Sequence, residues 1–269
     1  IDYLLAMDVS LPGFRFWRHV ADLTYAGLEA KCLRIRLSMP SLAVSPDRRD
    51  LVIYDFGPWS ECNVMFVWRD MQLQRVQTPA MTTSSGRYLQ SIVTMADDRP
   101  NMYRVFAYGG LRCSAAVPES ISEAVRSNNA EAVWAKLSTS CKVCSGLRYM
   151  RIRSSRGVIH GTRWEVLQVA QSESSPGPLV LPSLLAFNGT LLAFGGMHGY
   201  SPSVPGKTTP DKSHCAFWIY RVQDRIWIPQ QSNLTTMCSI AEKNKFTPGM
   251  EMYHSHPHAV WLANGPSIL

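Results

Sequence analysis

Short apolar runs separated by turn signals recur along this chain, and the clearest group of them spans residues 181–230. Asn188-Gly189 lies between the first two runs and is typical of a two-residue hairpin turn, because both residue types tolerate positive φ. Gln223-Asp224 separates the last two runs in the same way. The predicted strands are residues 182–185, 191–194, 217–220 and 225–229. Four short antiparallel strands cannot bury both of their faces alone, so this unit predicts further copies of itself.

Similar units are expected on both sides of this one. Pro-Ser-Leu opens a copy at residues 40–42, as it does at residues 182–184, and another copy begins at Gly86. The first residues of the sequence match the third strand of such a unit, and its last residues match part of the second strand of another. We therefore expect either that its two ends complete one sheet or that it is part of something longer. The expected units are residues 38–78, 86–168 and 180–230, with a fourth made of residues 1–20 and 254–269.

Residues 111–148 form an insertion within the second copy. Ser120-x-x-Glu123 is a capping box, which marks the start of a helix. Apolar residues then recur with an approximate helical spacing. We therefore expect one helix around residues 118–137 in an otherwise all-β chain.

Paired glycines end the second strand in two of the copies, and an aromatic pair separated by six residues spans the third and fourth strands of the clearest unit. The residues of this pattern are Gly57, Gly109, Gly110, Trp164, Gly195, Gly196, Tyr220 and Trp227. The pattern resembles the kelch repeat. This resemblance implies a β-propeller with four-stranded antiparallel blades, of which residues 1–269 form a single domain or a part. Glycines let two backbones approach closely, and the aromatic pair can pack between neighbouring blades.

The aromatic pair is less regular in the other copies. Phe66 and Leu73 hold the same spacing in the first copy with other residue types. Tyr149 and Trp164 stand further apart in the second copy. We therefore expect a longer turn between the third and fourth strands of that copy.

The connections differ in length between the two ends of the predicted sheets. Turns that join the first to the second strand and the third to the fourth lie at one end and are mostly short, whereas the other connections are long. Long loops on a rigid scaffold often carry function. We therefore expect a protein-binding scaffold or adaptor that uses the long-loop face, with another protein or other chains of a larger assembly as its partner. The candidate binding residues are Arg112, Tyr200, Lys207, Lys212, Lys243 and Lys245.

A sugar-acting propeller, either a sialidase-like glycoside hydrolase or a lectin, is the alternative. Glycoside hydrolysis needs two facing carboxyl groups. The candidate acids are Asp55, Asp97, Asp98, Asp224 and Glu251. The sequence has no phosphate-binding glycine loop, nucleophile elbow or His-Glu-x-x-His motif, so we assign no catalytic residue and no cofactor.

Composition narrows the function only slightly. A chain of 269 residues that is 46% hydrophobic can bury a sizeable core. Its formal net charge of +7 comes from scattered Lys and Arg residues, so the charge gives no specific nucleic-acid signal. No apolar run is long enough to span a bilayer.

Two groups of residues have spacings found among metal ligands, and neither is assigned to a metal. Cys141-x-x-Cys144 could be half of a zinc site, a local disulfide or two ordinary thiols. His254-x-His256-x-His258 has the spacing of ligands on one strand face, but Pro257 interrupts it and no acid lies near in sequence.

Asn188-Gly189-Thr190 and Asn233-Leu234-Thr235 are N-glycosylation sequons. The first of them already has an explanation as a hairpin turn. The sequons have meaning only in a chain that enters the secretory pathway, and the sequence leaves the compartment open.

Overall fold

The computed structural model contains strands and turns, with no helix among the residues that it describes. The expected helix over residues 118–137 lies outside them. The described residues are 2–7, 17–23, 41–56, 63–70, 72–78, 87, 90–113, 141–155, 157–167, 175–180, 182–196, 217–230, 259–262 and 265–268.

Three antiparallel sheets form most of the described fold, and each corresponds to one of the expected copies. The first contains β3 (Ser41–Val44), β4 (Leu51–Phe56), β5 (Asn63–Arg69) and β6 (Gln72–Arg75), paired in chain order. The second contains β7 (Ser91–Ala96), β8 (Met102–Tyr108), β11 (Arg148–Ser155), β12 (Val158–Gly161) and β13 (Glu165–Val166). The third contains β14 (Ser183–Phe187), β15 (Thr190–Phe194), β16 (Phe217–Arg221) and β17 (Ile226–Gln230), again in chain order.

The second sheet departs from the prediction at its fourth strand. The turn after β11 is tight rather than long, with Gly157 at a φ of +78° between Ser155 and Val158. β12 pairs with one end of β11 and β13 with the other, so two short strands share the fourth position. The extra residues form an irregular segment between them, where the Thr162 hydroxyl accepts a hydrogen bond of 3.0 Å from the Arg151 backbone amide. The expectation of a longer turn is therefore wrong.

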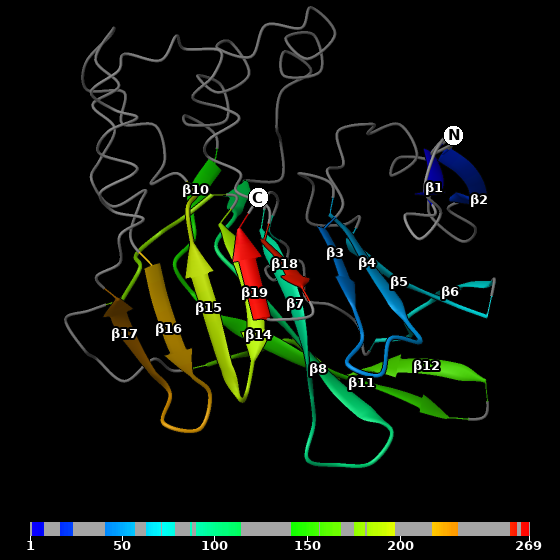
Figure 1. The fold of residues 1–269 in the computed structure, drawn as a ribbon. Coiled ribbons are helices and arrows are strands. Elements are labelled where there is room, and N and C mark those ends of the chain that lie inside the picture. Colours follow the sequence, from blue (N-terminus) through cyan, green and yellow to red (C-terminus); the bar gives the residue numbers. More distant parts are fainter. Residues whose placement is uncertain are drawn as a thin grey trace, which may run out of the picture.

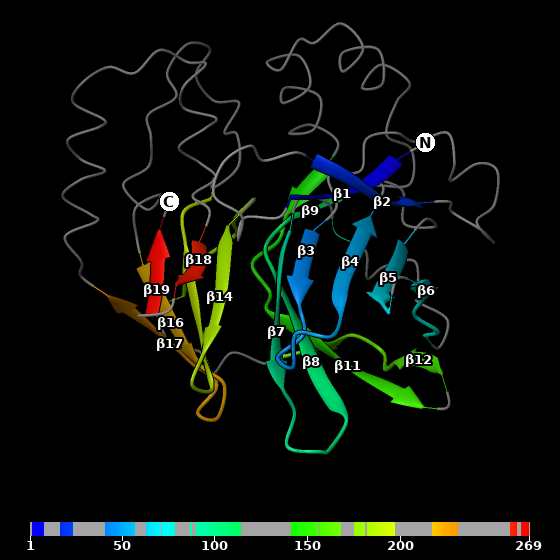
Figure 2. The same ribbon diagram turned by 45° about the vertical axis from the view of Figure 1, so that its right-hand side comes forward.

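The first strands of the three sheets, β3, β7 and β14, lie side by side (Figures 1 and 2). Side-chain hydroxyls link them to backbone carbonyls. Ser41 donates to the carbonyl of Gln90 over 2.5 Å. Thr94 donates to the carbonyl of Val44, and Ser91 donates to the carbonyl of Pro182. These hydrogen bonds join β3 to the chain around β7, and β7 to the chain that enters β14.

Two clusters of apolar side chains fill the spaces between neighbouring sheets. One joins the first and second sheets, and includes Val52 and Tyr54 of β4 with Val105 of β8 and Ile152 of β11. The other joins the second and third sheets, and its members include Phe106, Tyr108, Leu191, Tyr220 and Trp227. The sheets therefore pack face to face, as the sequence pattern predicts.

Trp227 is an inter-sheet aromatic residue, as expected from its place in the repeat. Only 2% of its surface is exposed. Its ring centroid lies 4.9 Å from that of Tyr220 in its own sheet and 5.2 Å from that of Tyr108 in the second sheet. These rings join the two sheets.

The paired glycines bring the ends of β8 and β15 close to the segment that enters the third sheet. Gly109, with a φ of +72°, lies so near residue 179 that an added Cβ would stand 2.3 Å from the Leu179 carbonyl oxygen. The Gly110 amide donates to the same oxygen over 2.7 Å. Gly196, with a φ of +87°, is similarly close to Val180 and Pro182. A side chain at Gly109 would therefore push the second sheet away from this segment, and a side chain at Gly196 would crowd the same segment from within the third sheet.

The remaining described strands form small hairpins. β1 (Asp2–Met7) pairs with β2 (Trp17–Leu23), and β18 (Ala259–Leu262) pairs with β19 (Gly265–Ile268). The described strand pairings do not join these two hairpins, which lie apart in both views (Figures 1 and 2). A single sheet made from residues 1–20 and 254–269 stays a prediction.

Replacing Trp227 by Ala should lower the free energy of unfolding by about 3–5 kcal/mol, because a fully buried aromatic ring is lost between two sheets. Thermal and denaturant unfolding measure this change. Val166→Ala is the control, since Val166 is 66% exposed and its truncation should change stability by no more than about 0.5 kcal/mol. Equal effects of the two substitutions would contradict the packing.

Gly109→Ala and Gly157→Ala separate backbone strain from close approach. Both glycines have positive φ, which costs an alanine roughly 1–2 kcal/mol. An added Cβ at Gly157 meets nothing within 4 Å, whereas at Gly109 it meets the Leu179 carbonyl. We expect Gly109→Ala to cost about 1–3 kcal/mol more than Gly157→Ala in denaturant unfolding. Equal costs would show that the glycine pair does not set the spacing of the sheets.

Candidate functional site

The three sheets have two unlike ends. We call one the turn end, because the β7–β8, β14–β15 and β16–β17 turns lie there, at the bottom of Figure 1. We call the other the connection end, since the strands there lead into the connections 57–62, 79–90, 114–140, 168–182, 197–216 and 231–258, most of which are long. The candidate site lies at the connection end.

A hairpin at the connection end carries two exposed basic residues. It consists of β9 (Leu111–Cys113) and β10 (Cys141–Val143), which lie at the top of Figures 1 and 2. Arg112 and Lys142 stand opposite each other in its register, and both are exposed. The Cys144 amide donates to the Gly110 carbonyl over 2.8 Å, which ties the hairpin to the end of β8.

Arg87 lies beneath this hairpin and interacts mainly with backbone groups. One guanidinium nitrogen, Nη1, donates to the Gly146 carbonyl over 2.5 Å and reaches the Gly109 carbonyl at 3.4 Å. Burial is the largest cause of its lowered pKa, and the nearby positive charge of Arg112 lowers that pKa further. Arg87 and Arg112 are therefore close enough to repel each other.

Arg148 begins β11 and is almost fully buried, with 2% of its surface exposed. Its Nη2 donates to Gln90 Oε1 over 2.8 Å, and its guanidinium lies 4.5 Å from the centre of the Trp164 ring. Trp164 in turn meets the Tyr54 ring edge-on at 5.7 Å. Nε of Arg148 has no hydrogen-bond partner in the described part of the chain. Burial lowers the Arg148 pKa to about 10, so the side chain still carries its charge at neutral pH.

We call four basic residues at this end the basic cluster: Arg87, Arg112, Lys142 and Arg148. Among the described residues, no Asp or Glu forms an ion pair with any of them. Asp55 lies near this end of β4 by its backbone position, and its side chain is outside the described part. Buried charges are normally paired, because taking them out of water is costly. Within the described residues, the charge of Arg148 is therefore met by an amide oxygen and an aromatic ring and by no acid.

Acids and arginines pair at the turn end instead. The Asp50 side chain is fully buried and accepts hydrogen bonds from Arg69 Nη2 at 2.7 Å and from the Tyr103 hydroxyl at 2.9 Å. Arg69 Nη1 also donates to Ser154 Oγ over 2.7 Å, so the group joins the first sheet to the second. The hydrogen bond to Asp50 is the largest cause of the raised pKa of Arg69. Asp50 therefore has a structural role, because its contacts hold the first sheet against the second.

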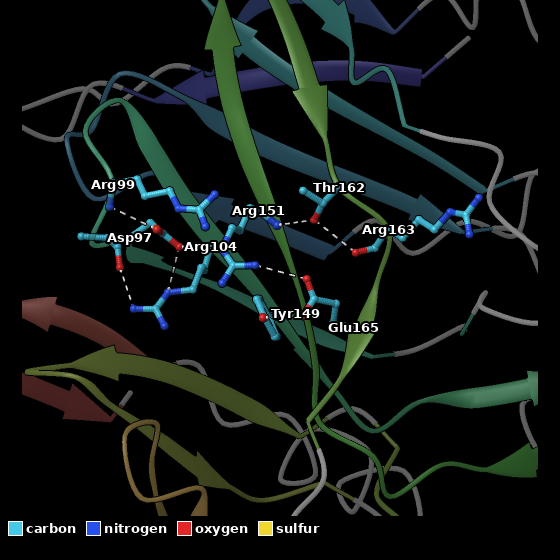
Figure 3. A network of polar contacts seen from close by, with 9 residues as sticks. Asp97, Arg99, Arg104, Tyr149, Arg151, Thr162, Arg163 and Glu165 are labelled. Atoms are coloured by element: carbon cyan, nitrogen blue, oxygen red, sulfur yellow. Dashed lines mark hydrogen bonds and ion pairs between the residues drawn. The ribbon is translucent and has the colours of Figure 1, made fainter.

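A second acid–arginine network bears on the sugar-acting alternative (Figure 3). Arg151 donates from Nε to Asp97 Oδ2 over 3.1 Å and from Nη1 to Glu165 Oε1 over 3.2 Å. Arg104 Nε lies 3.5 Å from the same Asp97 oxygen, and the Tyr149 hydroxyl donates to Glu165 Oε2 over 2.6 Å. The two acids share one arginine, so the group connects neighbouring strands of the second sheet. This arrangement gives no support to a catalytic acid pair.

The candidate binding residues from the sequence are only partly described. Arg112 lies at the connection end, as expected, whereas Tyr200, Lys207, Lys212, Lys243 and Lys245 lie outside the described residues. Gly57 lies outside them as well. Arg87, Lys142 and Arg148 were not among the expected site residues. A signal for Arg148 was present, because Met150 and Ile152 follow it at alternate positions and place it on the core-facing side of β11.

The two cysteines of the Cys-x-x-Cys sequence have different states. Cys141 is disulfide-bonded and Cys144 is a free thiol, so a disulfide between these two is wrong and they do not form half of a zinc site. Within the described ranges, no group of three or more His, Cys, Asp or Glu side chains could hold a metal ion. His254, His256 and His258 lie outside those ranges.

No protein-family model matches this chain, and no curated protein matches it significantly. The residues that the structure describes contain no helix of the length and apolar character needed to cross a membrane. The description that these findings support is therefore an all-β protein with repeated four-stranded antiparallel sheets.

Arg148→Met should leave the free energy of unfolding within about 1 kcal/mol of the parent value or raise it, because a buried charge that no described acid pairs with is replaced by an apolar chain of similar length. Denaturant unfolding measures the change beside Trp227→Ala. A loss for Arg148→Met as large as that for Trp227→Ala would show that the contacts with Gln90 and Trp164 make Arg148 a structural residue.

Proposed function

We propose that this protein is a kelch-like propeller scaffold that binds an acidic segment of another protein at its connection end. The basic cluster carries the proposal, since it gathers positive charge at the end where the long connections lie. The three sheets are its blades, and β3, β7 and β14 are the innermost strands. Their side-by-side arrangement and the aromatic contacts between sheets support this architecture.

The cluster has two layers with different roles. Arg112 and Lys142 are exposed on the β9–β10 hairpin and can contact a partner directly. Arg87 and Arg148 are more buried than these two residues. Their less polar surroundings strengthen the electrostatic attraction between their charges and an anion. Arginine forks also match the geometry of carboxylate groups. An acidic segment over the hairpin would supply the negative charge that the described acids do not bring.

Binding of an acidic sugar is the second candidate, because the same cluster fits a sugar carboxylate. The sugar-acting alternative does not require a catalytic pair if the protein is a lectin. An acidic sugar would contact only a small part of the cluster, whereas a peptide can follow the exposed basic pair along the hairpin. The peptide therefore fits the spread of the cluster better.

Binding is tested with three labelled probes in fluorescence anisotropy: an oligoglutamate peptide, a sialylated oligosaccharide and a single-stranded RNA. The variant Arg112→Glu/Lys142→Glu reverses both exposed charges of the basic cluster. Arg49→Glu/Arg153→Glu is its matched control, because these arginines are exposed at the turn end and the change in net charge is the same. We expect the cluster variant to weaken oligoglutamate binding by about tenfold or more, and the control by less than about threefold.

The outcomes separate the candidates. Equal weakening by both variants would reduce the effect to overall charge and contradict a site at the connection end. Binding of the sialylated probe alone would support the lectin alternative. Binding of RNA alone would contradict a protein partner.

A further inference from the structure

One sequon lies at the exposed tip of a hairpin. Asn188 and Gly189 form the two-residue turn between β14 and β15, with φ values of +44° and +72°. Asn188 is exposed, and the β14–β15 turn lies at the bottom of Figure 1, away from the connection end. An added Cβ at Gly189 would meet nothing within 4 Å, so the space around this turn is open. The Asn188 amide is therefore reachable by an enzyme that modifies it.

An exposed aromatic ring stands beside that asparagine. Phe187 is 42% exposed. Phe187 and Thr190 are partners in the β14–β15 register, so their side chains lie on the same face of the hairpin. The Thr190 hydroxyl, the third residue of the sequon, donates to the Phe187 carbonyl over 2.5 Å. The sequon threonine and the exposed Phe187 thus share one face of the hairpin, and Asn188 directly follows Phe187 in the turn.

An independent observation concerns the compartment. Cys141 is disulfide-bonded, and Cys113 stands opposite it in the backbone register of β9 and β10. Disulfides form and persist in oxidising compartments such as the lumen of the secretory pathway. N-linked glycans are added in that pathway.

We propose that Asn188 carries an N-linked glycan whose first sugar packs against Phe187. A bond forms between Nδ2 of Asn188 and the anomeric carbon of the sugar, and the bond from that carbon to the diphosphate of a lipid-linked oligosaccharide breaks. The amide loses one proton and lipid diphosphate is the leaving group, so no oxidant or reductant is needed. The apolar C–H face of the sugar covers the exposed ring, which removes apolar surface from water. The glycan stands at the turn end and leaves the basic cluster uncovered, and this inference does not rest on the proposed function.

The N-glycosylation of Asn188 is tested on the protein isolated from its native cells with its free thiols blocked. Its peptides are treated with an amidase that removes N-glycans in ¹⁸O-labelled water, and mass spectrometry then reads Asn188. Conversion of Asn188 to ¹⁸O-labelled aspartate is the expected result. An unmodified Asn188 would overturn the proposal. Asn233, in the second sequon, is read in the same experiment and shows whether occupancy is specific to the hairpin.

Variants of the full chain, secreted from cultured cells, test the contact with Phe187. Asn188→Asp keeps a residue that favours this turn but cannot accept the sugar, so it should lose one glycan without a loss of fold. Removing the glycan enzymatically should lower the Tm of the parent by about 2–4 °C and leave the Tm of Phe187→Ala unchanged. Equal shifts in the parent and in Phe187→Ala would contradict packing against the ring.

Discussion

The close approach of Gly109 to the backbone of Leu179 sets how the second and third sheets meet. Because the Gly110 amide donates to the same carbonyl, the chain that enters the third sheet is fixed against the end of β8. Tyr108, next to the glycine pair, can then pack on Trp227 across the interface. Gly196, at the end of β15, lies against the same entering segment from within the third sheet. The backbone contact at Gly109 and the aromatic contact between Tyr108 and Trp227 therefore both hold the second sheet against the third.

This arrangement places different charges at the two ends of the sheets. At the turn end, Asp50 and Asp97 accept hydrogen bonds from arginines and join neighbouring strands or sheets. At the connection end, the partners of Arg87 and Arg148 among the described residues are backbone carbonyls, an amide oxygen and an aromatic ring. Within the described residues, buried acids therefore pair with arginines at the turn end, whereas no described acid pairs with the basic cluster at the connection end.

Much of this fold can be predicted from the sequence because the repeated pattern is local. Asn188-Gly189 predicts the β14–β15 hairpin turn, where both residues have positive φ. The position of Trp227 in the repeat predicts its burial, and 2% of its surface is exposed. The β11–β12 turn at Gly157 was not predicted from the sequence. The strand that follows it is short and alternates exposed and buried residues, so it lacks a continuous apolar run. The basic cluster depends on tertiary surroundings, because burial of Arg148 is decided by Gln90 and Trp164 from other parts of the chain. Only its alternation with Met150 gave a local signal.

Hydrogen exchange measured with and without a saturating oligoglutamate peptide tests the central claim most directly, because it locates the contact without a substitution. Slower exchange should appear at residues 109–113 and 141–148, which form and flank the β9–β10 hairpin. The β7–β8 and β14–β15 turns should exchange at unchanged rates, since they lie at the opposite end. Protection confined to these turns, with none at the hairpin, would contradict a binding site at the connection end.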